Sequence, residues 1–440
     1  MKKIFFLLSV FVVQALLVIL QMGCQNQKKS ASEGSGDGKI VMWGFFEGMP
    51  KAALDHYAAV SGKEVAYQTI GWGDYTTKLN TVLGTKDAPD VMLLERSFMG
   101  QYMPLDKIMA VNELWNDKPE MQAYLKNSDP SITGQTNVNG KVKGIGWENT
   151  SGAFFYRSDM AKKYLGVNTV AEMEALISKK DKFITLMKDF EKKAPGVKFM
   201  STNYMASVLL SLSGAYNVQP DGSYIITKEV AEAFKDVKEF YEMKNFYSPT
   251  YDKTAIMNGA KKDKFFSHMM PAWAIQDIKE WGQSGKWAIA NPPIKYAMGG
   301  TFIAVSNTAD KDLVWDFLAS TFLNEKWILD NMSGFGMVAN SKIMKEYLAN
   351  SDAGGNEYFG GQNTIAKFAE ISAGVDNVIS ATLYDSGLKK VTDDIINGLT
   401  IDATIKNENE AVNKLKQELA TLYPDLKILN EQQVSMSDKK

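Results

Sequence analysis

Strands and helices alternate along the chain from residue 39 onward, and no other feature constrains the fold as much. Residues 39–43 and 65–70 have strand character, and residues 50–60 between them have helical character. A further helix is expected over residues 74–83, followed by a strand over residues 90–94. Strands that alternate with helices form a largely parallel sheet, because each helix carries the chain back across the sheet. The sequence therefore predicts an α/β fold.

Local signals predict where these elements begin and end. Pro50 suits the first turn of a helix, and Gly62 suits the left-handed residue that ends one. Asp74 is expected to cap the next helix. Asn139-Gly140 predicts a tight hairpin turn. Beyond it we expect mainly helix over residues 158–260, strands over 288–294 and 301–305, and helix with loop breaks over 310–422.

The first 24 residues have the composition of an export signal. Lys2 and Lys3 precede a mostly apolar run from Ile4 to Leu20. Cys24, the single cysteine of the chain, follows this run and looks like the acceptor of a bacterial lipoprotein anchor, although Leu20 lies one place too far from it for a strict match. The alternative is an uncleaved membrane anchor, since a run of about 17 residues can just span a bilayer. Both interpretations place the rest of the chain outside the cytoplasmic membrane.

Composition limits the remaining possibilities. Residues 1–23 are interpreted as signal peptide, and residues 24–38 as a flexible tether too poor in apolar groups to fold. The roughly 400 residues that follow suggest two domains. The net charge of −2 argues against nucleic acid as the main partner, because phosphate binding needs a basic surface. A single cysteine offers no disulfide within the chain, so packing must supply the stability.

Catalytic and metal-binding patterns are missing. The stretch from Gly134 to Lys141 has five residues between its glycines, and a valine follows it where a magnesium-binding hydroxyl is needed. The two histidines, His56 and His268, have no partner at metal-ligand spacing. We therefore expect no catalytic residue, no metal and no cofactor. Carboxylates are numerous enough that a glycosidase pair stays open.

Five segments, taken in order, resemble family 1 extracellular solute-binding proteins, the lipoprotein or periplasmic receptors of ABC importers. The resemblance spans nearly all of residues 39–425. The segments are Ile40–Gly44, Ala88–Val91, Asn139–Asp159, Phe266–Trp273 and Gly299–Ser306.

The resemblance implies a periplasmic-binding-protein fold with two lobes and a hinged interlobe cleft. Lobe 1 is expected to comprise residues 39–148 and 301–335, and lobe 2 residues 149–300 and 336–430. Ligand binding would close the cleft, and the closed form would signal to the membrane permease that cargo is loaded. The resemblance implies a binding protein that is not an enzyme, and we expect a monomer because closure needs free lobes.

Ligands of such folds lie beyond the carboxyl ends of the strands. Aromatic rings stack on the flat faces of a sugar, while carboxylates and arginine bind its hydroxyl groups. The Glu95–Arg96 pair, Glu148, Trp273 and Tyr384 resemble positions of the maltose-binding branch. The expected ligand-binding residues are Phe46, Glu47, Trp72, Glu95, Arg96, Trp147, Glu148, Trp273, Phe335 and Tyr384.

Some of these residues have a structural alternative. Trp43 and Tyr75 are expected in the core, and Arg96 could serve as a partner of Glu95 rather than as a ligand contact. Trp147 follows Gly146 at a place where the family usually has proline, and its bulk would narrow the cleft for an oligosaccharide.

We expect the ligand to be a mono- or oligosaccharide. The alternatives are a polyamine or a sugar or glycerol phosphate, a secreted glycosidase or lyase, and a surface adhesin that binds no small molecule. A polyamine site would use the carboxylates of Glu47, Glu95 and Glu148, whereas a phosphate site would need more basic residues than Arg96 alone.

Overall fold

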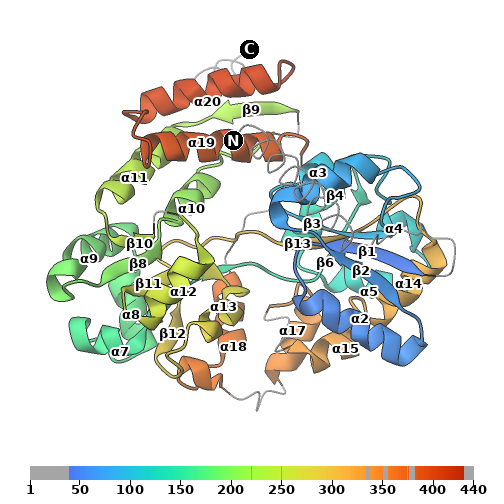
Figure 1. Ribbon diagram of the computed structural model, residues 1–440, viewed down its shortest axis with the longest axis horizontal. Helices are drawn as coiled ribbons and strands as arrows, with labels where there is room; N and C mark the ends of the chain where they lie inside the picture. Colours follow the sequence, from blue (N-terminus) through green and yellow to red (C-terminus); the bar gives the residue numbers. More distant parts are fainter. Residues whose placement is uncertain are drawn as a thin grey trace, which may run out of the picture.

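The computed structural model describes residues 39–219, 221–248, 250–332, 337–349, 355–373, 375 and 382–430. These residues form two lobes, each built around a five-stranded mixed sheet (Figure 1). The α/β, two-lobe prediction is thereby confirmed. The expected signal peptide, the tether with Cys24, and Phe335 lie outside the described residues. In the described part of the chain, no helix is long and apolar enough to cross a membrane.

The first lobe contains the sheet with strand order β2-β1-β3-β13-β6. Its three N-terminal strands are parallel, and β13 runs antiparallel to both of its neighbours. Side chains of β3 alternate between two buried clusters, with Val91 and Leu93 on one face and Met92 and Leu94 on the other. This burial on both faces explains why the strand reads as an unbroken apolar run. The strands are β1 (Ile40–Gly44), β2 (Val65–Thr69), β3 (Val91–Glu95), β6 (Ile145–Gly146) and β13 (Thr301–Val305).

Helices cover both faces of this sheet (Figure 1). Trp43 and Tyr75 are buried, as expected. A small hairpin at Asn139-Gly140 joins β4 to β5, and both turn residues have positive φ, which confirms the predicted turn. The remaining elements are α2 (Gly48–Ser61), α3 (Trp72–Val82), η1 (Met99–Gln101), α4 (Val111–Leu114), α5 (Pro119–Asn127), α6 (Pro130–Gln135), β4 (Asn137–Val138), β5 (Lys141–Val142), α14 (Lys311–Ser320), α15 (Glu325–Asp330) and α17 (Ser341–Ala349).

The second lobe contains the sheet with strand order β10-β8-β11-β7-β12. Strands β10, β8 and β11 are parallel, whereas β7 is antiparallel to β11 and β12. Neighbouring aromatic residues again point to opposite faces, as Phe154 and Phe155 show by joining different buried clusters. The strands are β7 (Gly152–Arg157), β8 (Lys198–Thr202), β10 (Phe246–Ser248), β11 (Phe265–Pro271) and β12 (Trp287–Ala290).

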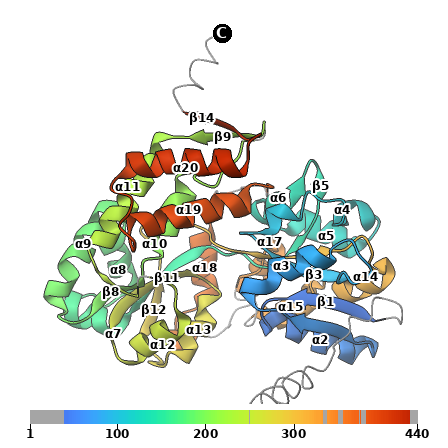
Figure 2. The ribbon, with the colours of Figure 1, turned by 45° about the horizontal axis from the view of Figure 1, so that its top comes forward.

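Helices surround the second sheet, and two long C-terminal helices cap it together with a small two-stranded sheet (Figures 1 and 2). The elements are α7 (Ser158–Met160), η2 (Ala161–Leu165), α8 (Val170–Ile177), α9 (Lys180–Lys193), α10 (Met205–Leu212), β9 (Ser223–Ile226), α11 (Lys228–Glu242), α12 (Lys253–Lys261), α13 (Ala274–Glu280), η3 (Glu357–Phe359), α18 (Thr364–Ser372), α19 (Asp385–Leu399), α20 (Glu408–Leu422) and β14 (Lys427–Asn430).

The segments that connect the lobes bond to one another. Residues 147–151 lead from β6 to β7, and residues 291–300 lead from β12 back to β13. The Gly152 amide donates to the Tyr296 carbonyl at 2.7 Å, and the Met298 amide donates to the Thr150 carbonyl at 3.0 Å. Residues 337–340 lie between α15 and α17 of the first lobe and pair with the first connection, where the Asn149 amide donates to the Met337 carbonyl at 2.9 Å.

Three details differ from the sequence-based expectations. Residues 158–260 contain β8, β9 and β10 besides helices, because these strands are too short, or buried on too many sides, to show a clear period of two. Asp74 lies in the first turn of α3, whose N-cap is Gly71. Helix α17 packs against α15 and therefore belongs with the first lobe, beyond the boundary expected at residue 335.

The N-terminal end of α19 reaches across to the first lobe and contacts η1 (Figure 2). A Cβ added to Gly100 in η1 would lie 1.9 Å from the Thr382 carbonyl oxygen, so only glycine permits this approach. The Arg96 guanidinium also bonds the buried Asp385 carboxylate at 2.5 Å across the same contact.

We expect Gly100→Ala to lower the free energy of unfolding by about 1–3 kcal/mol, because its methyl group forces α19 away from η1. Urea unfolding monitored by circular dichroism would measure the change. Gly73→Ala is the matched control, since a Cβ at Gly73 in α3 meets no atom within 4 Å. Equal stability of Gly100→Ala and the wild type would contradict the close interlobe contact.

Candidate functional site

In the first lobe, the carboxyl ends of the three parallel strands carry the residues that the sequence singled out. Trp72 follows β2, Phe46 and Glu47 follow β1, and Glu95 ends β3. The parallel arrangement brings these ends to one edge of the sheet, which is where ligands of open α/β sheets bind.

An aromatic group occupies this edge. The Phe45 ring lies 5.0 Å from the Trp72 ring and 6.0 Å from the Phe98 ring, in edge-to-face contacts. Trp72 and Phe98 are 5.4 Å apart. Trp72 is nevertheless 53% exposed, so the group holds its indole in place while leaving much of it open to solvent.

Two carboxylates lie beside the start of β13. Glu95 is the register partner of Thr301, and its Oε2 accepts a hydrogen bond from the Ser97 amide at 2.7 Å. Glu148 Oε1 accepts a hydrogen bond from the Thr301 amide at 3.2 Å. Both side chains are partly buried. The first connection between the lobes and the end of β3 therefore place two acids around one residue.

Burial raises the pKa of both carboxyl groups. The pKa of Glu148 rises to about 7, mainly through burial and further through the nearby charge of Glu95, against the hydrogen bonds from Thr301. Burial also raises the pKa of Glu95, although hydrogen bonds from Ser97 and the charges of Arg96 and Lys389 oppose the shift. Near neutral pH the two carboxyl groups are therefore partly protonated.

In the second lobe, aromatic residues follow the three parallel strands. Tyr251 follows β10, Tyr204 follows β8, and Trp273 follows β11 as the N-cap of α13. The Tyr204 and Tyr251 rings lie 6.1 Å apart. Burial raises the pKa of Tyr204 to about 12, and the charges of Glu95 and Asp393 add to that shift. Tyr204 is therefore within electrostatic reach of a carboxylate that belongs to the other lobe.

Gly299 and Gly300 separate the two sets of residues. Their φ angles are 75° and 117°, which glycine adopts without strain. A Cβ at Gly299 would lie 3.4 Å from Glu95 Oε1 and 4.0 Å from Trp273 Nε1, so the acid of one lobe and the indole of the other converge above this residue. We call the surface formed by Trp72, Glu95, Glu148, Tyr204, Tyr251 and Trp273 the interlobe face.

Sequence reasoning missed Tyr204 and Tyr251 because it read residues 158–260 as mainly helical. Without β8 and β10, neither tyrosine stands at a strand end. The signal was present in Phe199-Met-Ser-Thr, a short run of buried residues bounded by turns, but its length does not separate a strand from a buried helical turn.

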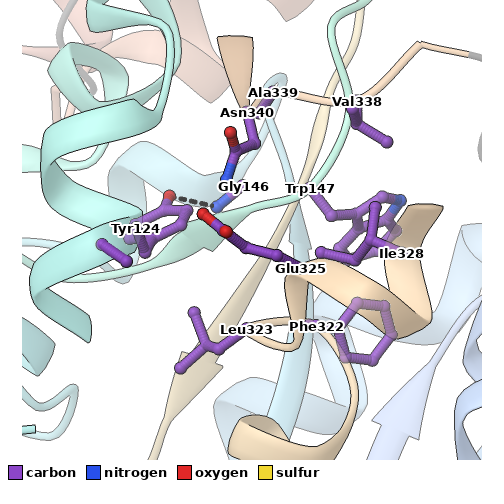
Figure 3. Close-up of a pocket in the computed structure, with 11 residues that line it drawn as sticks. Tyr124, Gly146, Trp147, Phe322, Leu323, Glu325, Ile328, Val338, Ala339 and Asn340 are labelled. Atoms are coloured by element: carbon purple, nitrogen blue, oxygen red, sulfur yellow. Dashed lines mark hydrogen bonds between the residues drawn. The ribbon is translucent and has the colours of Figure 1, made fainter. Parts of the chain in front are cut away.

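Trp147 is buried in the first lobe, contrary to its expected place at the cleft. Its ring lies 5.2 Å from Phe322 and beside a cavity of about 20 Å³, which is roughly the size of one water molecule (Figure 3). Gly146, just before it, is held to the Tyr124 hydroxyl by a 2.9 Å hydrogen bond. The bulk of Trp147 therefore fills the core and does not narrow the interlobe face.

Four further residues that the sequence predicted as ligand contacts are not part of the interlobe face as defined above. Arg96 pairs with Asp385 and not with Glu95. Phe46 packs against Phe45 and the core, and Glu47 is an exposed N-cap residue of α2. Tyr384 makes an edge-to-face contact with Tyr423 at 5.0 Å.

In the described part of the chain, no cluster of three or more potential metal-binding side chains occurs. The arrangement on the interlobe face is instead one of aromatic surfaces and hydrogen-bonding groups, which is suited to holding an organic molecule.

Comparison with known proteins agrees with this arrangement. A family described as bacterial extracellular solute-binding protein matches residues 52–342, more than half of the chain. The chain belongs to this family. Its members bind solutes and are not enzymes. No curated protein sequence matches the chain.

Solved structures of solute-binding proteins share the fold at low sequence identity. A family 1 extracellular solute-binding protein has 17% identity and a TM-score of 0.71, and covers 87% of this chain and 99% of its own. An ABC transporter associated binding protein from B. animalis subsp. lactis, in complex with beta-1,6-galactobiose, has 17% identity and a TM-score of 0.71, with coverage of 89% and 99%. The galacto-N-biose-/lacto-N-biose I-binding protein from Bifidobacterium longum has 17% identity and a TM-score of 0.63, with coverage of 86% and 97%.

The raised pKa of Glu148 predicts how the stability of this solute-binding protein depends on pH. A pKa of about 7 in the folded state, above the ordinary 4.5, contributes stability that is complete below pH 4.5 and is lost as the pH rises through 7. Relative to Glu148→Gln, the wild type should lose about 3 kcal/mol of unfolding free energy across this window. Chemical unfolding without ligand at a series of pH values measures it.

Glu232→Gln, on the exposed face of α11, is the control and should leave the wild-type pH dependence unchanged. Parallel curves for the wild type and Glu148→Gln would contradict the proposed protonation of Glu148.

Proposed function

We propose that this protein is the extracytoplasmic substrate-binding component of an ABC importer, and that it captures a mono- or oligosaccharide between its lobes. One observation carries the proposal. Aromatic rings stand at the carboxyl ends of three parallel strands in each of two connected sheets, and Glu95 of one lobe and Trp273 of the other converge above Gly299.

The chemistry of the interlobe face suits a sugar. Trp72 and Trp273 each expose part of an indole, at 53% and 37%, and an indole stacks well on the C–H face of a pyranose. Glu95 and Glu148 supply acceptors for hydroxyl protons. Several neighbours of this fold carry a sugar in their descriptions, including beta-1,6-galactobiose, alpha-D-tagatose and lacto-N-biose, which supports the same ligand class here.

Binding would act by changing the population of two lobe arrangements. A ligand that contacts both lobes binds the closed form better and shifts the equilibrium toward it. The connecting segments supply the hinge, because their hydrogen bonds tie both lobes to the same short stretch of backbone. The closed form of a monomer would then be the form that the permease recognises.

The other candidate ligands fit less well. A phosphate ester needs free basic groups, yet Arg96 and Lys389 are both paired with aspartates. A polyamine would use the carboxylates and the aromatic faces as well, so it is the main alternative that the ligand screen must separate from a sugar. A glycosidase does not agree with a family that binds solutes without turnover.

A thermal-shift screen of the lipid-free chain against sugars, polyols, polyamines and sugar phosphates tests the proposal. A ligand that binds only the native state adds about 2.7 kcal/mol of stability at a hundred times its dissociation constant. We expect a shift with a carbohydrate and no product. A shift confined to polyamines or phosphates would overturn the proposed ligand, and no shift at all would favour an adhesin.

Trp273→Ala should weaken carbohydrate binding by about tenfold or more, because the indole offers the main stacking surface of the second lobe. Its effect on unfolding should be small, since Trp273 is 37% exposed. Isothermal titration with the sugar found in the screen measures the change. Trp72→Ala provides the matching test in the first lobe. Unchanged affinity in both variants would contradict the assignment of the interlobe face as the ligand-binding surface.

We further propose that Cys24 carries a lipid that tethers the protein to the outer face of the cytoplasmic membrane or to the cell surface. Cys24→Ser should move the protein from the membrane fraction to the soluble fraction and abolish incorporation of a labelled fatty acid. The alternative, an uncleaved anchor, predicts two other results. The wild type would incorporate no labelled fatty acid, and the Cys24→Ser variant would stay unprocessed in the membrane fraction.

A further inference from the structure

The charged groups around the interlobe face do not balance. Each nearby basic side chain is already paired with an aspartate. Arg96 bonds Asp385 at 2.5 Å, Lys389 bonds Asp393 at 2.6 Å, and Lys253 bonds Asp277 at 2.7 Å. These three basic side chains therefore form ion pairs with aspartates and not with Glu95 or Glu148.

Glu95 and Glu148 have no such partner. Among the described residues neither forms an ion pair, and their hydrogen bonds come from neutral donors, the Ser97 and Thr301 amides at 2.7 and 3.2 Å. Arg96 follows Glu95 directly in the sequence, but its guanidinium is turned to Asp385. The charges of Arg96 and Lys389 act on Glu95 from a distance, but neither acid has an ion-pair partner among the described residues, a costly arrangement in a partly buried site.

The location of this uncompensated charge is also unusual. Glu148 lies in the first connection between the lobes, Thr301 begins the strand that follows the second, and Val338 of the first lobe forms an antiparallel bridge with Glu148. The acid pair therefore stands where the two connecting segments meet. A ligand group that neutralises it would contact the hinge itself.

A neutral sugar does not supply the positive charge that the two acids lack. Its hydroxyl groups can donate hydrogen bonds to Glu95 and Glu148, but they bring no positive charge. A protonated amine supplies both the donors and the charge, and charge-assisted hydrogen bonds are roughly twice as strong as neutral ones. The aromatic surfaces of Trp273 and Tyr204 at the same place favour a ring over a flexible chain.

We infer that the bound saccharide is an amino sugar with a free, protonated amino group that sits between Glu95 and Glu148. This inference rests on the proposed function and narrows its ligand class. The ring stacks on Trp273 while the ammonium group donates to both carboxylates. The raised pKa values of the two acids agree with a site built to receive a cation, because the ligand takes over the role of the proton held in its absence.

Titration calorimetry of the purified protein at pH 7 tests the inference with matched pairs of probes. The pairs are glucosamine and N-acetylglucosamine, galactosamine and N-acetylgalactosamine, and the β-1,4-linked glucosamine disaccharide and its di-N-acetyl form. Within each pair the ring and its hydroxyl groups are the same. Acetylation removes the positive charge of the nitrogen and adds an acetyl group, so the Glu148→Gln and Glu95→Gln variants below separate the effect of charge from that of size. Glucose and spermidine are included as a neutral sugar and a cation without a ring.

We expect at least one amine to bind about tenfold or more tightly than its acetylated partner, a difference of about 1.4 kcal/mol. Glu148→Gln and Glu95→Gln should each reduce this preference toward one while leaving unfolding at low pH near that of the wild type. Glu232→Gln, exposed on α11, should keep the full preference.

The outcomes separate the inference from the proposed function. Equal or tighter binding of the acetylated or neutral sugars would overturn the amino-sugar inference and leave the carbohydrate receptor standing. Binding of spermidine with no sugar would overturn both. Binding of none of these probes, together with no response in the wider carbohydrate screen, would also overturn both. A preference that persists in Glu148→Gln and Glu95→Gln would place the amine elsewhere and contradict the assigned site.

Discussion

The hydrogen bonds between the two segments that connect the lobes are the constraint on which the rest of the structure depends. Because Gly152 bonds Tyr296 and Met298 bonds Thr150, the chain leaves one sheet and returns to it through a single narrow bundle. That bundle sets the carboxyl ends of both groups of parallel strands toward each other. It also brings Glu148 to the start of β13, beside Glu95. The proposed recognition surface and the proposed hinge are thus made from the same few residues.

This shared location has an electrostatic consequence. Arg96 stabilises the contact between η1 and α19 by pairing with Asp385, and it forms no ion pair with Glu95. The acids at the hinge keep raised pKa values. The Arg96–Asp385 ion pair and the lack of an ion-pair partner for the two acids are therefore linked, and we propose that a ligand bound at the acids adds favourable energy to closure.

Part of this site was predictable from the sequence because its residues follow recognisable strands. Glu95 follows the apolar run of β3, and Trp273 ends a segment that resembles a family pattern. Tyr204 and Tyr251 escaped notice because β8 and β10 are five and three residues long and lack alternation. Trp147 was misplaced for a different reason. Its position in the chain suits the cleft, but the direction of its side chain is set by packing against Phe322. Whether Glu95, Trp72 and Trp273 contact ligand stays a prediction.

The sequence by itself determined the α/β class, the positions of the first three strands along the chain, the hairpin at Asn139-Gly140 and the family resemblance. All of these depend on residues close together in the chain, whose backbone preferences and apolar spacing act locally. The tertiary structure alone decided that Arg96 pairs with Asp385, that α17 joins the first lobe, and that Glu95 and Glu148 share one site. These facts join residues that are distant in sequence. Their energies come from burial and from charges brought together by folding, which no local pattern records.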